Sequence, residues 1–173
     1  TEVRKLDRKI AHEFLESYHI QGATRIQVAF GLFLGGELLA VVSGSEHHRV
    51  GGQFSLNRLC FKHGVTVVGG SSKLNKALVG WARSSGYGRV VTWSDNRWSL
   101  GAVYSAMGYA KEEELPPDYF YLDGNEVRSK QSCQKKHLAK KGARGKTERE
   151  MAESLGYDRI WDCGKIRWVL EIR

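Results

Sequence analysis

The 173-residue sequence has few cysteines, few prolines and no long hydrophobic run. No apolar stretch approaches the roughly 20 residues that a membrane-spanning helix needs, and the charged start, Thr1 to Lys5, does not resemble a signal peptide. The three cysteines, Cys60, Cys133 and Cys163, form no CxxC pair and cannot all be paired within the chain. The sequence therefore argues against a disulfide-stapled scaffold and favours a reducing, cytoplasmic setting.

Acidic residues are outnumbered, because 27 Lys and Arg stand against 19 Asp and Glu, which gives a formal net charge of +8. The excess lies between Arg128 and Arg149, where Glu148 is the only acid. Cations neutralise phosphates and release counterions, so this segment is a candidate nucleic-acid contact. A solvated, lysine-rich surface explains the same composition equally well, and the aromatic residues around the segment form no stacking pattern. The predicted nucleic-acid-binding residues are Arg128, Lys130, Lys135, Lys136, Lys140, Lys141 and Arg144.

Hydrophobic spacing predicts alternating helices and strands in one domain. The expected helices cover residues 4–18, 74–81, 100–107 and about 147–156, the last opened by a capping box at Thr147. The expected strands cover residues 26–34, 37–43, 54–61, 89–94, 119–122 and 126–129, with a closing hairpin over 160–161 and 166–172. This order predicts an α/β or α+β fold with one central sheet. We expect a core over residues 1–124 and a basic C-terminal extension, residues 125–173, packed on the same domain.

A glycine-rich junction between the strand at 54–61 and the following helix is a candidate anion site. It contains Gly69, Gly70, Ser71, Ser72 and Lys73. Backbone N–H groups at a helix N-terminus, unshielded by Cβ atoms at the glycines, can cradle a phosphate. An ordinary helix start capped by one of the serines is the alternative.

A second polar segment begins where the strand at 89–94 ends, which is the edge where open sheets place ligands. Asp95 there is a candidate general base, and capping of the next helix by Asp95 or Asn96 is the alternative. The histidines and cysteines do not have metal-site spacing, so no metal is predicted.

The order of elements, the glycine junction and the stretch from Asn96 to Tyr109 resemble the GNAT acyltransferases. In that family the helix after the fifth strand carries a Tyr four residues before a Gly-aromatic pair, as Tyr104 does here before Gly108 and Tyr109. The family's coenzyme A loop reads Arg/Gln-x-x-Gly-x-Gly/Ala, whereas this chain has Thr66 at the first position and Ser71 at the last. The resemblance implies an acyl donor held at Gly69 to Lys73; its identity stays open, with acetyl-CoA as one candidate.

A spaced set of residues between Tyr18 and Tyr109 also resembles the Mom family of phage DNA-modification proteins, which are distant GNAT members. The matching positions are His19, Arg58-Leu59, Ser71, Ser94-Asp95 and Tyr104. The resemblance implies that His19, Arg58, Asp95 and Tyr104 are catalytic, and that the product is adenine modified on its exocyclic amine. Asp95 or His19 would then accept the amine proton, Arg58 would orient donor or base, and Tyr104 would protonate the leaving group.

Over nearly its whole length the chain resembles a domain that follows nuclease modules in phage homing-type endonucleases. The shared pieces include residues 67–70, 119–121 and 157–164. This resemblance implies DNA as partner, and a bacterial cell carrying a phage as the setting. The leading expectation is therefore a transferase that modifies a DNA base. A non-catalytic DNA-binding domain and an acetyl-CoA-dependent N-acetyltransferase are the alternatives.

Overall fold

The computed structural model describes residues 1–172, which form two compact units. Unit 1 contains residues 1–94, residues 101–113 and the described end of the chain from Arg167; unit 2 contains residues 95–100 and 114–166. The boundary expected at residue 124 falls on a hairpin turn inside unit 2. No helix within residues 1–172 is long and apolar enough to cross a bilayer.

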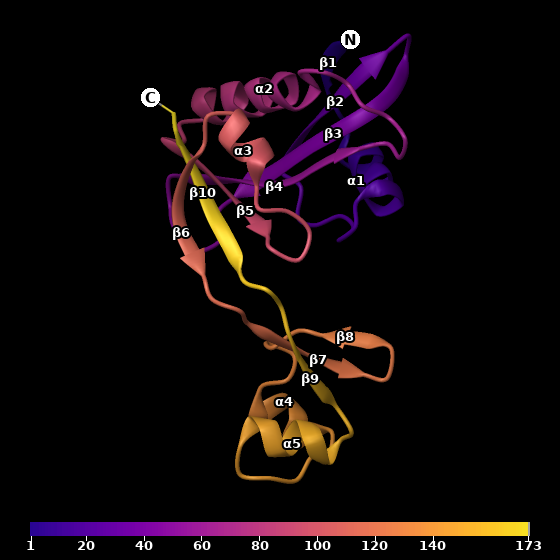
Figure 1. The fold of residues 1–173 in the computed structure, drawn as a ribbon, viewed down its shortest axis with the longest axis vertical. Helices are drawn as coiled ribbons and strands as arrows, with labels where there is room; N and C mark the ends of the chain where they lie inside the picture. The colour runs from indigo at the N-terminus through magenta and orange to yellow at the C-terminus, as the bar shows by residue number, and fades with distance from the viewer. Residues whose placement is uncertain (173) are drawn as a thin grey trace. The chain divides into compact units, whose positions relative to one another are not determined.

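Unit 1 is built on a mixed seven-stranded sheet in the order β1-β2-β3-β4-β5-β10-β6 (Figure 1). Its strands are β1 (Glu2–Lys5), β2 (Val28–Leu34), β3 (Glu37–Glu46), β4 (Gln53–Phe61), β5 (Arg89–Asp95), β6 (Ala110–Leu115) and β10 (Lys165–Glu171). Its helices are α1 (Arg8–Tyr18), α2 (Gly70–Ser84) and α3 (Ala102–Ala106). The first four strands pair antiparallel and β4 pairs with β5 in parallel, so the expected α/β (α+β) class is confirmed.

The segment expected as one helix over residues 4–18 divides into β1 and α1. The helix begins only after Asp7, because Asp7 is its N-cap: the Asp7 backbone is extended, not helical, and its carboxylate accepts a hydrogen bond from the Lys9 N–H. The apolar face of α1 then packs on the sheet, where its buried side chains meet Ala29, Val41 and Cys60. This packing fixes the end of α1, and with it the position of His19.

The predicted hairpin between β2 and β3 is confirmed. Gly35 and Gly36 take φ values of +56° and +86°, the left-handed backbone that a two-residue turn between antiparallel strands requires. Strand β3 is buried over most of its length and pairs with β4 in antiparallel orientation.

Unit 2 has a small core of its own. Its antiparallel sheet has the order β8-β7-β9, from β7 (Tyr119–Asp123), β8 (Glu126–Arg128) and β9 (Asp158–Trp161). Helices α4 (Lys135–Lys140) and α5 (Glu148–Ser154) supply Leu138 and Met151 to a buried cluster with Tyr121. The predicted capping box is confirmed, since Thr147 and Glu150 satisfy each other's backbone N–H groups.

One expectation about the sheets is confirmed and one is wrong. The expected central sheet is present in unit 1, and unit 2 has a second, three-stranded sheet. The closing hairpin does not form, because β9 pairs with β7 while β10 lies between β5 and β6. The turn between β9 and β10 is instead held by Asp162, whose carboxylate accepts hydrogen bonds from the N–H groups of Asp118 and Gly164. These bonds tie Asp162 to the segment entering β7, so its neighbours continue into separate sheets.

Candidate functional site

Strands β4 and β5 separate soon after they meet. They pair over three positions, the last of which joins Ser55 to Val91, and within residues 1–172 no further pair links them. Paired strands lie about 4.8 Å apart and leave no room for a side chain between them. Where the pairing ends, side chains of β4 can reach across the plane of the sheet.

A β-bulge in β4 lies just beyond this point. Ser43 of β3 faces Arg58 while the next residue, Gly44, faces Leu56, which leaves Asn57 as the extra residue. A bulge redirects the side chains that follow it and recurs beside active sites. Here it sets the direction of Arg58.

Arg58 is a half-buried cation held by two backbone carbonyl groups. Its Nε donates to the Gly22 oxygen and its Nη1 to the Asn57 oxygen, both at 2.9 Å. Burial lowers the pKa of Arg58, but a guanidinium remains charged in proteins. The other guanidinium N–H groups have no acceptor within the described residues, so Arg58 can bind an anion or a carbonyl oxygen.

His19 ends α1 and lies near Arg58. Its Nδ1 accepts a hydrogen bond from the Gln21 N–H at 3.0 Å. Burial, followed by the positive charge of Arg58, lowers the pKa of His19 to about 4. The ring is therefore neutral near pH 7, and since Nδ1 is the acceptor, Nε2 carries the proton. This arrangement favours a hydrogen-bond donor over the proton acceptor expected from the sequence.

Tyr104 of α3 completes the cluster. Burial raises the pKa of its phenol, and a hydrogen bond with Thr92 and the charge of Arg58 offset only part of this effect. The phenol is consequently protonated at neutral pH and can donate a proton. Three of the four predicted catalytic residues, His19, Arg58 and Tyr104, thus come together in unit 1. Thr92 was not singled out from the sequence, because nothing marks a buried strand threonine as functional.

Asp95 lies at the end of β5, as expected, and its carboxylate is bound by Arg97. The Arg97 Nη2 and Nε lie 2.6 Å and 3.0 Å from the two Asp95 oxygens, and the Arg97 N–H also donates to Asp95. These bonds lower the pKa of Asp95. The carboxylate is therefore ionised at neutral pH, and its role as general base stays a prediction.

The predicted anion loop forms the N-terminus of α2. Gly69, with φ of +71°, is the N-cap and supplies no side-chain cap. The N–H groups of Ser71 and Ser72 have no acceptor among the described residues, so they remain able to bind a phosphate. Lys73, the predicted cation of this loop, donates instead to the Thr1 hydroxyl at 2.9 Å.

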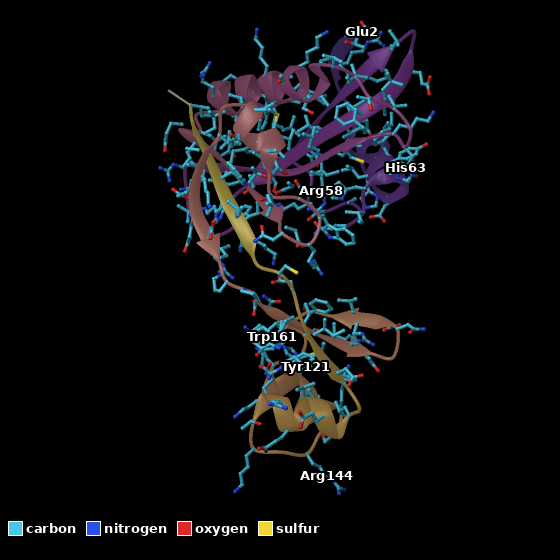
Figure 2. The ribbon with its side chains drawn as sticks, in the orientation of Figure 1. Glu2, Arg58, His63, Tyr121, Arg144 and Trp161 are labelled. Atoms are coloured by element: carbon cyan, nitrogen blue, oxygen red, sulfur yellow. The ribbon has the colours of Figure 1, made fainter. Side chains whose placement is uncertain are left out.

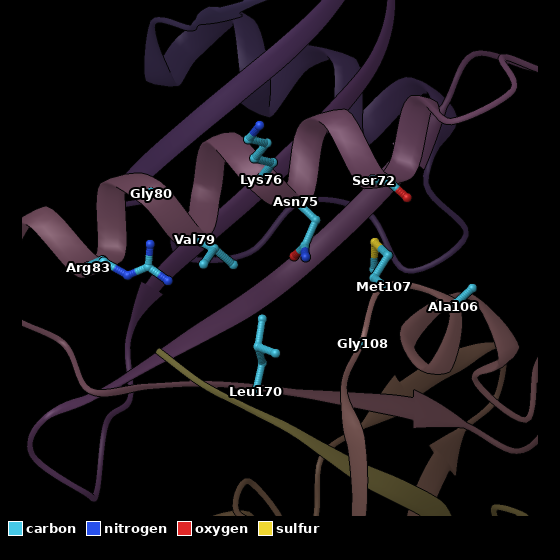
Figure 3. Close-up of a pocket in the computed structure, with 10 residues that line it drawn as sticks. All are labelled: Ser72, Asn75, Lys76, Val79, Gly80, Arg83, Ala106, Met107, Gly108 and Leu170. Atoms are coloured by element: carbon cyan, nitrogen blue, oxygen red, sulfur yellow. The ribbon is translucent and has the colours of Figure 1, made fainter. Parts of the chain in front are cut away.

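An open groove of about 560 Å³ runs along α2 from Ser72 toward the helix C-terminus (Figure 3). Lys76 and Arg83 line it from α2, and Met107 and Leu170 line it from the other side. No local sequence pattern indicates this groove, because its two walls are separated by more than twenty residues of chain. It provides cations beside the anion loop.

The predicted nucleic-acid segment is only partly neutralised in unit 2. Arg128 pairs with Asp123 and Glu126, and Lys130 pairs with Asp118. Arg149 pairs with Glu153. Six exposed basic residues of the segment have no carboxylate partner among residues 1–172, and we call them the cationic cluster: Lys135, Lys136, Lys140, Lys141, Arg144 and Lys146.

No family model and no curated protein sequence matches this chain. Several solved structures do match this chain. The chain is similar to Ard1 from Thermoplasma volcanium (11% identity, 99% of this chain and 97% of that one, TM-score 0.61). It is also similar to the ribosomal-protein-S18-alanine N-acetyltransferase of Escherichia coli (12%, 99% and 93%, 0.58) and to a Bacillus subtilis acetyltransferase in complex with CoA (12%, 96% and 84%, 0.53). At these identities the similarity shows the fold alone. The chain has the GNAT fold, the fold of the acyltransferase family that its sequence resembles.

Proposed function

We propose that this chain transfers an acyl group from a coenzyme A-type thioester to an exocyclic amine of a DNA base, with adenine favoured. The observation that carries the proposal is the meeting of His19, Arg58 and Tyr104 where β4 and β5 of a GNAT fold separate. A neighbour with the same fold is in complex with CoA, which supports the donor class.

The anion loop of α2 supports a donor that carries a diphosphate. The free N–H groups of Ser71 and Ser72, with Gly69 leaving the approach open, provide donors for phosphate oxygens. Lys76 and Arg83 add positive charge along the neighbouring groove. The loop thus fits a CoA-type donor although it lacks the first basic or amide residue of the family pattern.

The cluster supplies donors for acyl transfer. The amine nitrogen attacks the thioester carbonyl carbon, a C–N bond forms, and the C–S bond breaks. The charge of Arg58 and the His19 Nε2–H stabilise the negative charge that develops on the carbonyl oxygen. Tyr104, whose phenol is protonated at neutral pH, gives its proton to the leaving thiolate. Water takes up the proton that the amine loses and returns a proton to the Tyr104 oxygen.

The cationic cluster of unit 2 supports a nucleic acid as the acceptor. Six uncompensated cations within twelve residues match a phosphate backbone. Because both units belong to one chain, DNA held by unit 2 has a raised local concentration for unit 1. An adenine inside a duplex must still leave the stack to react.

A thiol-release assay on the purified chain tests the proposal. Wild type is mixed with a panel of acyl-CoA thioesters, with and without DNA, and the DNA is digested for nucleoside mass spectrometry. We expect DNA-dependent thiol release and a heavier nucleoside, both reduced at least tenfold in Tyr104→Phe. Tyr87→Phe is the matched control, since this tyrosine packs against Phe54 and Trp81, away from the cluster.

The second candidate is an acetyl-CoA-dependent N-acetyltransferase for a small amine or a protein, favoured by the names of the structural neighbours. If thiol release requires an amine or a peptide and does not depend on DNA, the chain is such an N-acetyltransferase and the proposal of DNA modification is wrong. DNA binding without thiol release from any donor would leave a non-catalytic DNA-binding domain.

A further inference from the structure

Unit 2 brings two aromatic rings together across its small sheet. Tyr119 of β7 faces Trp161 of β9 in the strand register, and their ring centroids lie 5.2 Å apart in an edge-to-face arrangement. The Trp161 side chain is 54% exposed, although a tryptophan ring usually becomes largely buried. No local sequence pattern predicts this pair, because the two residues are separated by more than forty positions and come into contact only through the pairing of β7 with β9.

An arginine accompanies the rings. Arg159 precedes Trp161 by two residues, so both point to the same face of β9. Its guanidinium carbon lies 4.8 Å from the Tyr119 ring centroid and 5.3 Å from that of Trp161. Within residues 1–172 no carboxylate pairs with Arg159, so its guanidinium carries an unpaired positive charge over the ring of an exposed indole.

A hollow of about 240 Å³ adjoins these side chains (Figure 2 labels Trp161 and Tyr121). It is lined by the exposed Trp161, by the buried Tyr121 and Tyr157, and by four charged residues: Asp158, Arg159 and the ion pair of Arg149 with Glu153 at 2.7 Å. An exposed indole among charged, hydrogen-bonding groups suits a flat ring that stacks on it and carries donors and acceptors on its edge.

The cationic cluster lies on α4 and the loop that leads to α5, in the same unit as this hollow. Cations along a backbone path combined with exposed aromatic rings are the features of sites that bind single strands, in which bases stack on aromatic side chains. A duplex does not offer its base faces in this way. If the lysine-rich surface served only solubility, there would be no physical reason to expose the large apolar ring of Trp161 beside Arg159.

We propose that unit 2 binds single-stranded DNA, with an unpaired base stacked on Trp161 beside Arg159 and the phosphates held by the cationic cluster. The inference deepens the proposed function and rests on its DNA acceptor. It makes unpaired DNA the preferred acceptor, in which the amine of adenine is accessible without base flipping.

Fluorescence anisotropy of the full chain tests this without any acyl donor. The probes are one labelled oligonucleotide as a single strand, the same strand annealed to its complement, and the RNA of the same sequence. The variants are Trp161→Ala, Arg159→Gln and the double variant Lys136→Gln/Lys140→Gln. Trp98→Ala is the matched control, because this tryptophan is 59% exposed and no cation lies over its ring among the described residues.

We expect wild type to bind the single strand more tightly than the duplex. Trp161→Ala should weaken single-strand binding by roughly 5- to 150-fold, the range of base stacking on an aromatic ring, with little change for the duplex or in Trp98→Ala. Arg159→Gln should act in the same direction, and it tests the site again if Trp161→Ala does not fold by circular dichroism. The lysine double variant should weaken both DNA forms and lower the salt dependence of binding.

Equal affinity for both DNA forms, or equal losses in Trp161→Ala and Trp98→Ala, would overturn the inference. Preference for the RNA strand would also overturn it, by replacing DNA with RNA as the ligand. Failure of acyl transfer with the single-strand preference intact would contradict the proposed function alone, because binding is measured in the absence of a donor.

Discussion

The burial of His19 beside the positive charge of Arg58 predicts a specific dependence of stability on pH. His19 has a pKa of about 4 in the folded chain against an ordinary value of 6.5. Between these values the unfolded chain binds one more proton than the folded chain, so folding stability falls as pH decreases through this range. The contribution is complete above pH 6.5 and is lost near pH 4.

The size of this effect follows from the shift. A difference of about 2.5 pKa units corresponds to at most about 3.4 kcal/mol. Because the His19 side chain is only half-buried, solvent screening reduces this to roughly 1–2 kcal/mol. The loss should appear between pH 7 and pH 4.5, in a window where most carboxylates are still ionised.

Urea unfolding of wild type and His19→Gln at several pH values measures the difference. Other groups titrate alike in both chains, so the extra loss in wild type isolates the imidazole. ¹⁵N spectra of the ring near pH 7 supply a second reading, in which the proton should lie on Nε2. Parallel pH profiles for the two chains, or a proton on Nδ1, would refute the assignment of His19 as a neutral donor.

Three further outcomes follow from the packing. Gly101→Ala should destabilise unit 1 by about 1–3 kcal/mol in thermal melts, because φ is +78° and a Cβ would lie 2.5 Å from the Trp168 Nε1; an unchanged melting temperature would contradict this. Tyr109→Phe should cost about 1–3 kcal/mol in urea, since the buried Asn75 Oδ1 loses the phenol donor at 2.8 Å, and a neutral result would mean that water replaces it. Thr147→Ala should remove about 0.5–2 kcal/mol of helix stability, which should appear as faster amide hydrogen exchange in α5 with unit 1 unaffected. Unchanged exchange rates in α5 would mean that the capping box does not stabilise this helix.

The sequence predicts those parts of this fold in which local signals agree. Apolar, β-rich segments on both sides of Gly35-Gly36 specify a hairpin, and Thr147 with Glu150 specifies a helix start, because each pattern has few other conformations. Helix α4 was missed, since its residues Lys135–Lys140 are almost wholly polar and only Leu138 is buried.

Long-range pairing was beyond these local signals. The turn after Trp161 has the composition of a hairpin loop, yet Asp162 bonds to Asp118 and Gly164, and the strands on its two sides join different sheets. The spaced residues His19, Arg58 and Tyr104 were predicted as one site through a family resemblance, and the fold brings them together. The contact between the half-buried Tyr119 and the exposed Trp161 has no such pattern in the sequence and is visible only in the structure.

The most direct test of the central claim is the mass spectrum of DNA nucleosides from bacterial cells that express this chain. The cell supplies the natural donor, so no assumption about the acyl group enters. Wild type should produce a nucleoside heavier than deoxyadenosine, and Arg58→Gln, which removes the cation held at Gly22 and Asn57, should produce little or none while remaining folded. An unmodified nucleoside pool in cells that contain soluble wild-type protein would contradict the account.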